Sequence, residues 1–264
     1  MGVRLTKCGT EARAARTVNR LEDCFSVIDA GCELSAGALQ DLLEVGFVVI
    51  PGPVAADQLE QFTEAYDSAV NSAAPDDVAI GSSTTRVNDF VNRGPEFDAL
   101  YVYEPVVEAC CRVIGQPFKL STMHARTVRP YSQTQDLHVD FRRAADGWPM
   151  VGFILMVDEF RTDNGATRFV PGSHKWLTIP TDLPQDTSAD CEGQVLACGP
   201  AGSVIVYNGS VWHGHTANGV DEPRRSIQGA YIRRDAESAF NQAALIRPET
   251  FGRIGNLARY VLAV

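Results

Sequence analysis

The chain has 264 residues, of which 45% are hydrophobic and 21% charged, the composition of a folded protein with a sizeable core. Its 33 acidic and 23 basic residues give a formal charge of −10, which argues against a protein that coats nucleic acid. No stretch approaches the roughly 18 apolar residues that a membrane helix needs. We therefore expect neither nucleic acid nor a membrane among its partners.

The seven cysteines are odd in number and form no C-x-x-C pattern, so a reduced, intracellular chain is the simplest interpretation. The first twenty residues lack the apolar core of a secretory signal, and we expect a cytoplasmic protein. Two alternatives rest on the same segment. Its arginines leave an organelle transit peptide open, and Met1-Gly2 with Thr6 fits the loose N-myristoylation pattern.

Three helices are predicted in the N-terminal part of the chain, about residues 1–116. They cover residues 34–46, 55–74 and 96–115, and a brief apolar strand is predicted over 47–50. Ser35 is a suitable N-cap for the first helix, and Gly46 is a suitable residue to end it. In the second helix apolar side chains recur every three or four residues, which indicates one buried stripe.

The chain changes character near residue 117. From about 117 to 235, short β-rich runs alternate with clusters of Gly, Pro, Asn and Asp that indicate turns. Helices followed by a series of short strands predict an α+β protein whose second part is a sandwich or barrel. Because no internal repeat or low-complexity linker interrupts the chain, we expect one domain over 1–264, with residues 236–264 as a C-terminal extension.

A metal site is predicted from two histidines and one carboxylate. His138 and Asp140 stand two residues apart, so on a strand both side chains would project from one face and reach the same ion. His213 supplies a second imidazole further along the chain. Two histidines and a carboxylate on one face of a metal form the triad of non-heme Fe(II) oxygenases, which leaves positions open for a cosubstrate and an oxidant.

A carboxylate clamp is predicted after the last metal ligand. Arg224 and Ser226 share one face of a predicted strand. A guanidinium binds a carboxylate through two parallel hydrogen bonds, and a nearby hydroxyl can add a third. A diacid that chelates iron at one end and is anchored at the other needs this arrangement, and 2-oxoglutarate is such a molecule. Arg225 is an alternative anchor, because a shift of one residue reverses the face of the strand.

These segments resemble the phytanoyl-CoA dioxygenase family of Fe(II)- and 2-oxoglutarate-dependent oxygenases. The matching residues are His138-x-Asp140, residues 164–174 (NGATRFVPGSH), Gly202, Trp212-His213-Gly214, Asn218 and Arg224-Arg225-Ser226. Order and spacing agree from about Arg86 to Arg234, more than half of the chain. Residues 86–91 (RVNDFV) and 209–213 (GSVWH) make the chain most similar to the branch that includes fungal meroterpenoid oxygenases.

The resemblance implies a double-stranded β-helix, also called a jelly roll or cupin-like barrel, with N-terminal helices packed on one sheet. It implies Fe(II) on His138, Asp140 and His213, O2 as oxidant, and 2-oxoglutarate held by Gln135, Thr167, Arg86 and Arg224, with Ser226. The implied reaction hydroxylates or otherwise oxidises an unactivated C–H bond of a small organic metabolite and releases succinate and CO2. Related halogenases replace the carboxylate ligand by a small residue, so Asp140 favours oxygenation. Relatives in this branch also suggest a homodimer.

Two other functions share part of this pattern. A cupin-like metal-binding module or sensor needs the barrel and the metal but not the anchor for 2-oxoglutarate. A zinc hydrolase could use the same ligands, although no glutamate beside them is an obvious general base.

Several residues near these motifs have alternative roles. His215 could compete with His213 for the metal, His174 fits a structural role in a turn, and His124 could face the site. Arg142-Arg143, directly after the first motif, could bind an anionic group of the substrate or lie in a solvated loop.

Overall fold

The computed structural model describes residues 33–177 and 186–264, so the N-terminal segment with its alternative targeting signals lies outside the described residues. Two antiparallel sheets form the centre of the protein. The larger contains, in spatial order, β1 (Phe47–Pro51), β8 (Ser203–Asn208), β5 (Met150–Met156), β10 (Arg224–Arg233), β4 (Phe118–Val128), β3 (Thr84–Val87) and β2 (Val78–Ile80). The smaller contains β7 (Val195–Ala197), β6 (Thr167–Phe169) and β9 (His213–His215).

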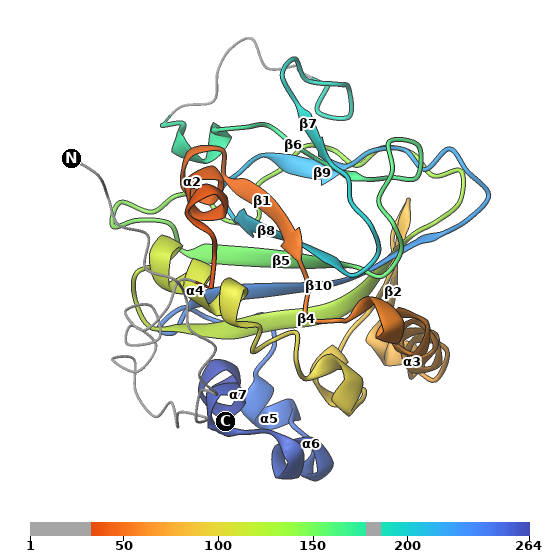
Figure 1. Ribbon diagram of the computed structural model, residues 1–264, viewed down its shortest axis with the longest axis vertical. Helices are drawn as coiled ribbons and strands as arrows, with labels where there is room; N and C mark the ends of the chain where they lie inside the picture. The colour runs from red at the N-terminus through yellow and green to blue at the C-terminus, as the bar shows by residue number, and fades with distance from the viewer. Residues whose placement is uncertain (1–32, 178–185) are drawn as a thin grey trace.

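Helices lie mainly on the side of the large sheet that faces away from the small one. They are α2 (Ala36–Glu44), α3 (Leu59–Asn71), α4 (Glu104–Val113), α5 (Gln242–Leu245), α6 (Pro248–Arg253) and α7 (Asn256–Leu262). In Figure 1 the small sheet is at the top and α3, α5, α6 and α7 are at the bottom, with the large sheet between them. The predicted packing of N-terminal helices on one sheet is present, and α7 from the C-terminal extension joins them against β4.

The first two predicted helices form where their local signals place them. The Ser35 side chain accepts a hydrogen bond from the backbone N–H of Ala38 at 3.1 Å, and the left-handed φ of +98° at Gly46 follows the end of α2. The second predicted helix is a 3₁₀ turn, Ala56–Gln58, that runs into α3, whose buried stripe includes Phe62 and Tyr66.

The prediction of a third helix over 96–115 was wrong at its start. Residues Pro95–Phe97 form a separate 3₁₀ turn, and α4 begins only at Glu104. Pro105 stands in the first turn of α4, where its missing N–H costs no helical hydrogen bond. An apolar stretch that includes the fully buried Tyr101 separates the two, because it packs into the core as an irregular segment.

The edge of the large sheet holds a hairpin that the sequence did not indicate. Strands β2 and β3 pair with each other, and β3 pairs with β4 so that Arg86 lies opposite Arg126. Both strands are short, and neither shows the alternation of apolar and polar residues that marks longer strands, since β2 reads VAI and β3 reads TTRV. This hairpin nevertheless carries Arg86 to the functional side of the sheet.

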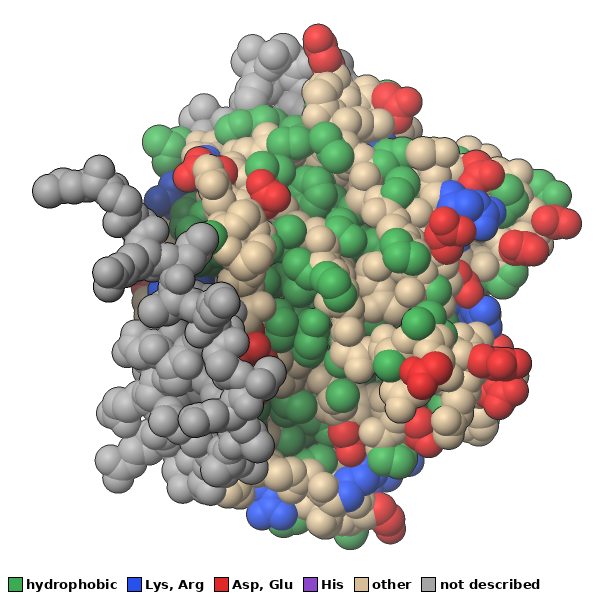
Figure 2. Space-filling view, in the orientation of Figure 1, with side chains coloured by type: hydrophobic (Ala, Val, Ile, Leu, Met, Phe, Trp, Pro, Cys, Tyr) green, Lys and Arg blue, Asp and Glu red, His purple; other side chains and the backbone are tan. Residues whose placement is uncertain are grey.

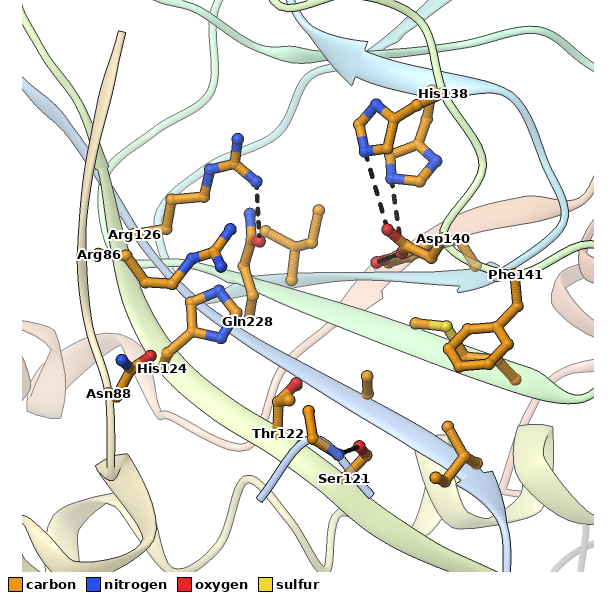
Figure 3. Close-up of a pocket in the computed structure, with 18 of the residues that line it drawn as sticks. Arg86, Asn88, Ser121, Thr122, His124, Arg126, His138, Asp140, Phe141 and Gln228 are labelled. Atoms are coloured by element: carbon orange, nitrogen blue, oxygen red, sulfur yellow. Dashed lines mark hydrogen bonds and ion pairs between the residues drawn. The ribbon is translucent and has the colours of Figure 1, made fainter. Parts of the chain in front are cut away.

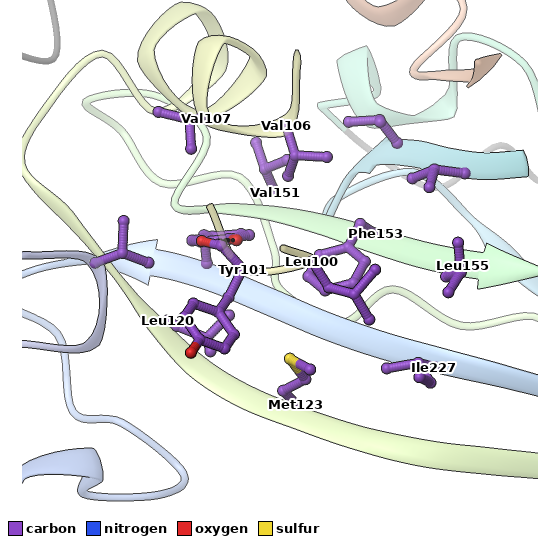
Figure 4. Close-up of a cluster of buried hydrophobic side chains, with 14 of the residues drawn as sticks. Leu100, Tyr101, Val106, Val107, Leu120, Met123, Val151, Phe153, Leu155 and Ile227 are labelled. Carbon is purple, nitrogen blue, oxygen red and sulfur yellow. Dashed lines mark hydrogen bonds between the residues drawn. The ribbon is translucent and has the colours of Figure 1, made fainter. Parts of the chain in front are cut away.

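The outer face of the large sheet is the main hydrophobic core. Alternate residues of β4, β5 and β10 point toward α4 and the segment before it, as Figure 4 shows for Met123, Phe153 and Ile227. Gly229 of β10 leaves room for a neighbouring ring, since a Cβ on it would lie 2.1 Å from Cε1 of Phe153. The remaining alternate residues of the same strands face the small sheet.

Candidate metal centre and cosubstrate pocket

A cavity of about 770 Å³ lies between the inner face of the large sheet and the small sheet. Its polar lining includes Arg86, Asn88, Thr122, His124, Arg126, Gln135, His138, Asp140, Thr167, His213, His215, Arg224 and Gln228. Its apolar lining includes Phe141, Met150, Ile154, Ile232 and Phe240. Figure 3 shows Arg86, Arg126 and His124 on one side of the cavity and Asp140 with Phe141 on the other. A cavity of this size and mixed lining is typical of a small-molecule site.

The three predicted metal ligands come together in this cavity. Nε2 of His138 and Nε2 of His213 each lie 3.7 Å from a different oxygen of Asp140. One candidate ligand atom from each residue lies within 4.8 Å of the others, close enough for one ion. These are the only residues in the described part of the chain that form such a cluster of three or more His, Cys, Asp or Glu side chains.

The local structure that brings the ligands together differs from the predicted strand. His138 makes an isolated β-bridge with His213 through two backbone hydrogen bonds of 2.9 Å, and Asp140 lies in the bend that follows. The N–H of Asp140 donates to the carbonyl of Gly209, which ties the bend to the end of β8. The spacing argument assumed a strand through His138 and Asp140; instead, a single bridge across the sheets and the bend after it position the two candidate ligands.

Hydrogen bonds to the backbone prepare both imidazoles for a metal. Nδ1 of His138 lies 3.0 Å from the carbonyl oxygen of Asp136, and Nδ1 of His213 lies 2.9 Å from that of Val211. A carbonyl can only accept, so each Nδ1 carries the proton and each Nε2 has a free lone pair. Burial also lowers the pKa of His213, which favours its neutral form. The donor set of two neutral imidazoles and a carboxylate fits Fe(II).

Tyr207 donates a hydrogen bond to the carboxylate of the candidate metal centre, and the sequence did not indicate this contact. Its hydroxyl donates to Oδ2 of Asp140 at 2.8 Å. Gly152 makes room for its ring, since a Cβ there would lie 2.2 Å from Cζ of Tyr207. Burial is the main cause that raises the pKa of Tyr207 well above 10, and the charge of Asp140 raises it further. The hydroxyl therefore stays protonated and can donate. Such partners fix the orientation of metal-binding carboxylates.

The two candidate arginines point in opposite directions. Arg225 forms ion pairs with Asp158 and Asp67 at 2.6 and 2.7 Å, away from the cavity. Arg224 lines the cavity, is only 1% exposed, and has its guanidinium carbon 4.0 Å from the centre of the Phe160 ring. Its Nε and Nη1 have no hydrogen-bond partner among residues 33–177 and 186–264. Because buried charges are normally paired, Arg224 has the properties of a clamp for an anionic ligand.

The other residues predicted to bind 2-oxoglutarate divide into two groups. Gln135, Thr167 and Arg86 line the cavity. Ser226 is fully buried and does not line the cavity, and its hydroxyl donates to the backbone carbonyl of Arg126 at 3.0 Å. The geometry therefore does not support the predicted direct hydrogen bond from Ser226 to a carboxylate.

The remaining histidines lie outside the metal cluster. Nε2 of His215 is 2.9 Å from the hydroxyl of Ser83, and its Nδ1 donates to the carbonyl of Thr216, so neither nitrogen turns toward Asp140. His174 is buried, and its Nε2 donates to the carbonyl of Leu43, as its predicted structural role requires. His124 lines the cavity, as anticipated, and burial lowers its pKa to about 3.

Arg126 is the second residue that the sequence did not single out. It projects from β4 into the cavity beside Arg86 (Figure 3). Its Nη2 donates to the side-chain oxygen of Gln135 at 3.0 Å, and its Nη1 donates to that of Gln228 at 3.4 Å. The period-two pattern of β4 could have indicated it, since His124 and Arg126 are two residues apart.

A model of the family described as phytanoyl-CoA dioxygenase (PhyH) matches residues 42–226, more than half of the chain. The chain belongs to this family. The multifunctional dioxygenase prhA of Penicillium brasilianum is 30% identical over 217 residues, which cover 73% of this chain and 70% of that protein. The multifunctional dioxygenase ausE of Emericella nidulans is 30% identical over 216 residues, with coverage of 73% and 71%.

Solved structures have the same fold as this member of the phytanoyl-CoA dioxygenase family. The α-ketoglutarate-dependent carbocyclase SnoK of nogalamycin biosynthesis superimposes with a TM-score of 0.63 at 17% identity, covering 82% of this chain and 92% of SnoK. HygX of Streptomyces hygroscopicus, whose structure holds nickel and 2-oxoglutarate, gives 0.62 at 17% identity, covering 78% and 93%. The predicted double-stranded β-helix is confirmed.

Family membership also confirms the predicted reaction class. The chain is an Fe(II)- and 2-oxoglutarate-dependent oxygenase that uses O2 and acts on a small molecule. In the view of Figure 2, basic side chains are scattered singly among acidic ones. No helix in the described part of the chain is long and apolar enough to cross a membrane.

Proposed function

We propose that His138, Asp140 and His213 hold the Fe(II) of this oxygenase, and that the enzyme oxidises an unactivated C–H bond of a small organic metabolite. Succinate and CO2 are the coproducts. The observation that carries this assignment is the convergence of two unprotonated imidazole nitrogens and a carboxylate within 4.8 Å, on the wall of a cavity that also holds a buried, unneutralised guanidinium. The metal and the cosubstrate supply the oxidising power, while the protein orients the reactants and excludes water.

Arg224 is proposed to bind the far carboxylate of 2-oxoglutarate. Its unpartnered Nε and Nη1 can each donate one hydrogen bond, and Phe160 supports the flat guanidinium from one side. Gln135, Thr167 and Arg86 are proposed to assist, because all three border the same cavity. Ser226 is assigned an indirect role, in which it holds the backbone of Arg126 in place.

Four further predictions from the sequence are retained. The intact Asp140 favours oxygenation over halogenation, because a carboxylate at this position occupies the coordination site that a halide would take. The single-domain organisation, the homodimer and the cytoplasmic location likewise stay predictions.

The assignment is tested by anaerobic titration of 2-oxoglutarate into the Fe(II)-loaded protein. We expect the visible charge-transfer band of the iron chelate in the native protein and its loss in the Asp140→Ala variant. Asp136→Asn is the matched control, because this exposed carboxylate stands two residues from His138 but does not line the cavity. Equal bands in all three proteins would contradict the ligand assignment.

A second readout separates the enzyme from the alternative of a metal-binding module or sensor. Admission of O2 to the iron and 2-oxoglutarate complex should produce succinate, at a rate that rises when an accepted substrate is added. A chelate band without any succinate, across all candidate substrates, would instead favour the binding module.

A further inference from the structure

Arg126 is a charged group that the proposed function leaves without a counter-ion. Its guanidinium donates to two neutral amide oxygens, those of Gln135 and Gln228, and its Nε is sealed from solvent without a partner among the described residues. Burial lowers the pKa of Arg126 to about 10, and the neighbouring charge of Arg86 adds to this effect. The carboxylate that acts most on Arg126 is Asp140, which belongs to the metal centre.

A count of charges around the cavity leaves an excess of one positive charge on its inner wall. Two charges of Fe(II) are balanced by Asp140 and by the chelating carboxylate of 2-oxoglutarate. The charge of Arg224 is balanced by the far carboxylate of the same molecule. Arg126 and the more exposed Arg86 then remain, and Glu237, an exposed carboxylate that also lines the cavity, offsets one of these two charges. An uncompensated charge in a partly desolvated pocket attracts an anion strongly.

His124 places a second unsatisfied polar group beside Arg126. The two residues stand two apart on β4, and His124 lies opposite Gln228 of β10. His124 is only 9% exposed, and its Nε2 is buried without a hydrogen-bond partner in the described part of the chain. Burial, followed by the charges of Arg86 and Arg126, lowers the pKa of this imidazole and keeps it neutral, so it can donate one hydrogen bond without adding a charge. Figure 3 shows His124 directly below the two arginines.

The rest of the cavity is suited to a hydrocarbon skeleton. Phe141 lines the cavity on the side away from Arg86 (Figure 3), Met150 and Ile154 line it from β5, with Ile154 opposite Gln228, and Ile232 extends the apolar lining along β10. The volume of about 770 Å³ exceeds what the five-carbon diacid alone would fill. A substrate that occupies the remainder would therefore touch apolar groups at one end and Arg126 with His124 at the other.

Resting on the proposed function, we infer that the substrate is an amphipathic carboxylic acid whose carboxylate binds Arg126 and His124 while its carbon skeleton lies against Phe141, Met150 and Ile154. The carboxylate would accept hydrogen bonds from the guanidinium and the neutral imidazole, and the apolar wall would hold the C–H bonds that face the metal. This subsite adjoins that of Arg224, which serves the cosubstrate: the two arginines stand on neighbouring strands, and burial, followed by the charge of Arg126, lowers the pKa of Arg224 to about 9.

The exposed pair Arg142-Arg143 offers a rival site for an anionic group. Neither residue lines the cavity, and the Arg143 guanidinium stacks over the ring of Trp148 at 5.0 Å. Both are exposed to solvent, where an ion pair is screened and contributes little. The Arg142→Gln variant is therefore a suitable matched control, since it removes a nearby arginine outside the subsite.

The test measures binding of phenylalkanoic acids of increasing chain length, each paired with its primary amide, to the anaerobic Fe(II) and 2-oxoglutarate complex. Formation of the chelate band before any probe is added reports the proposed function independently, so failure at that step is a failure of the metal assignment. Each probe is then titrated, and its affinity is read from the shift of that band and from calorimetry.

We expect the acids to bind at least about tenfold tighter than their amides, because a charged hydrogen-bonded pair is stronger than a neutral one. The preference should disappear in Arg126→Gln, persist in Arg126→Lys, and be unchanged in Arg142→Gln. Equal affinity for acids and amides, or no binding by either series, would overturn the inference. So would loss of the chelate band on addition of acid, which would mean that the acid displaces 2-oxoglutarate, and so would loss of preference in Arg142→Gln alone.

Discussion

The two faces of β4, β5 and β10 have the same backbone but opposite character. On the outer face, Met123, Phe153 and Tyr231 pack against helices, and their polar atoms are satisfied. On the inner face, His124 and Arg224 present buried nitrogen atoms that have no partner among the described residues. Unsatisfied buried groups destabilise a fold, so their concentration on one face indicates that ligands complete them. Because successive side chains of a strand point to opposite faces of the sheet, each of these strands supplies residues both to the hydrophobic core and to the candidate site.

The largest effect on stability is expected from the outer face. Phe153→Ala removes a ring that is 1% exposed and that packs over Gly229 and beside Tyr231. We expect the free energy of unfolding to fall by about 3–5 kcal/mol, because the cavity left behind cannot collapse around a glycine. Urea denaturation measures this change. Metal affinity of the folded protein should stay within about twofold of native, and a large loss of affinity would show that the faces are not independent.

Replacement of a buried inner-face charge should have the opposite effect on stability. Arg224→Met keeps an unbranched side chain against Phe160 but removes a guanidinium that is 1% exposed. We expect the free energy of unfolding of the ligand-free protein to rise by about 1 kcal/mol or more, since an unpaired buried charge is lost. The affinity for 2-oxoglutarate, followed by the chelate band, should fall at least about a hundredfold. A destabilised variant would show that Arg224 is structural.

The sequence predicted the parts of the site that depend on residue type and local spacing. The three candidate metal ligands and Arg224 were singled out because few residue types bind iron or a carboxylate, and because the family motifs surround them. The choice between Arg224 and Arg225 stayed open, because it depends on which face of β10 meets the cavity. Pairing of β10 with β4 and β5 decides it, and that pairing is not a local property.

What the sequence did not predict depends on contacts between distant segments. Tyr207 supports Asp140 only because β8 ends beside the bend that follows His138. Arg126 faces the cavity because it lies opposite Arg86 and Ser226, ahead of an irregularity in the pairing at Ala230 and Tyr231. The spacing of His138 and Asp140 fits one face of a strand, yet His138 pairs with β9 through a single bridge. Register and bridging arise from the assembled sheets.

A matched pair of substitutions compares the two faces directly. Tyr207→Phe removes the hydroxyl that holds Asp140, and Tyr231→Phe removes a hydroxyl that donates to the carbonyl of Tyr101 on the outer face. We expect Tyr207→Phe to weaken metal binding by about 10–100-fold, because the carboxylate loses its orienting partner. Tyr231→Phe should cost about 1 kcal/mol of stability and leave metal affinity unchanged. Titration with Fe(II) or Co(II) measures both, and equal metal affinities in the two variants would refute the role of Tyr207.

The smallest expected effect is the dependence of stability on pH that inner-face imidazoles impose. Burial lowers the pKa of His215 to about 4, and Arg126 and Arg224 contribute to this shift. An unfolded histidine titrates near pH 6.5, so on acidification the unfolded chain takes up the proton first. The contribution of His215 is therefore complete above pH 6.5 and is lost between about pH 6.5 and 4, by at most about 1.4 kcal/mol per pH unit. We expect urea denaturation of the metal-free protein to give a shallower slope in His215→Gln than in the native chain between pH 6 and pH 5 (about the middle of this window). An unchanged slope would mean that His215 is already protonated in the folded state, and the inner face would then carry one more positive charge than the count above assigns to it.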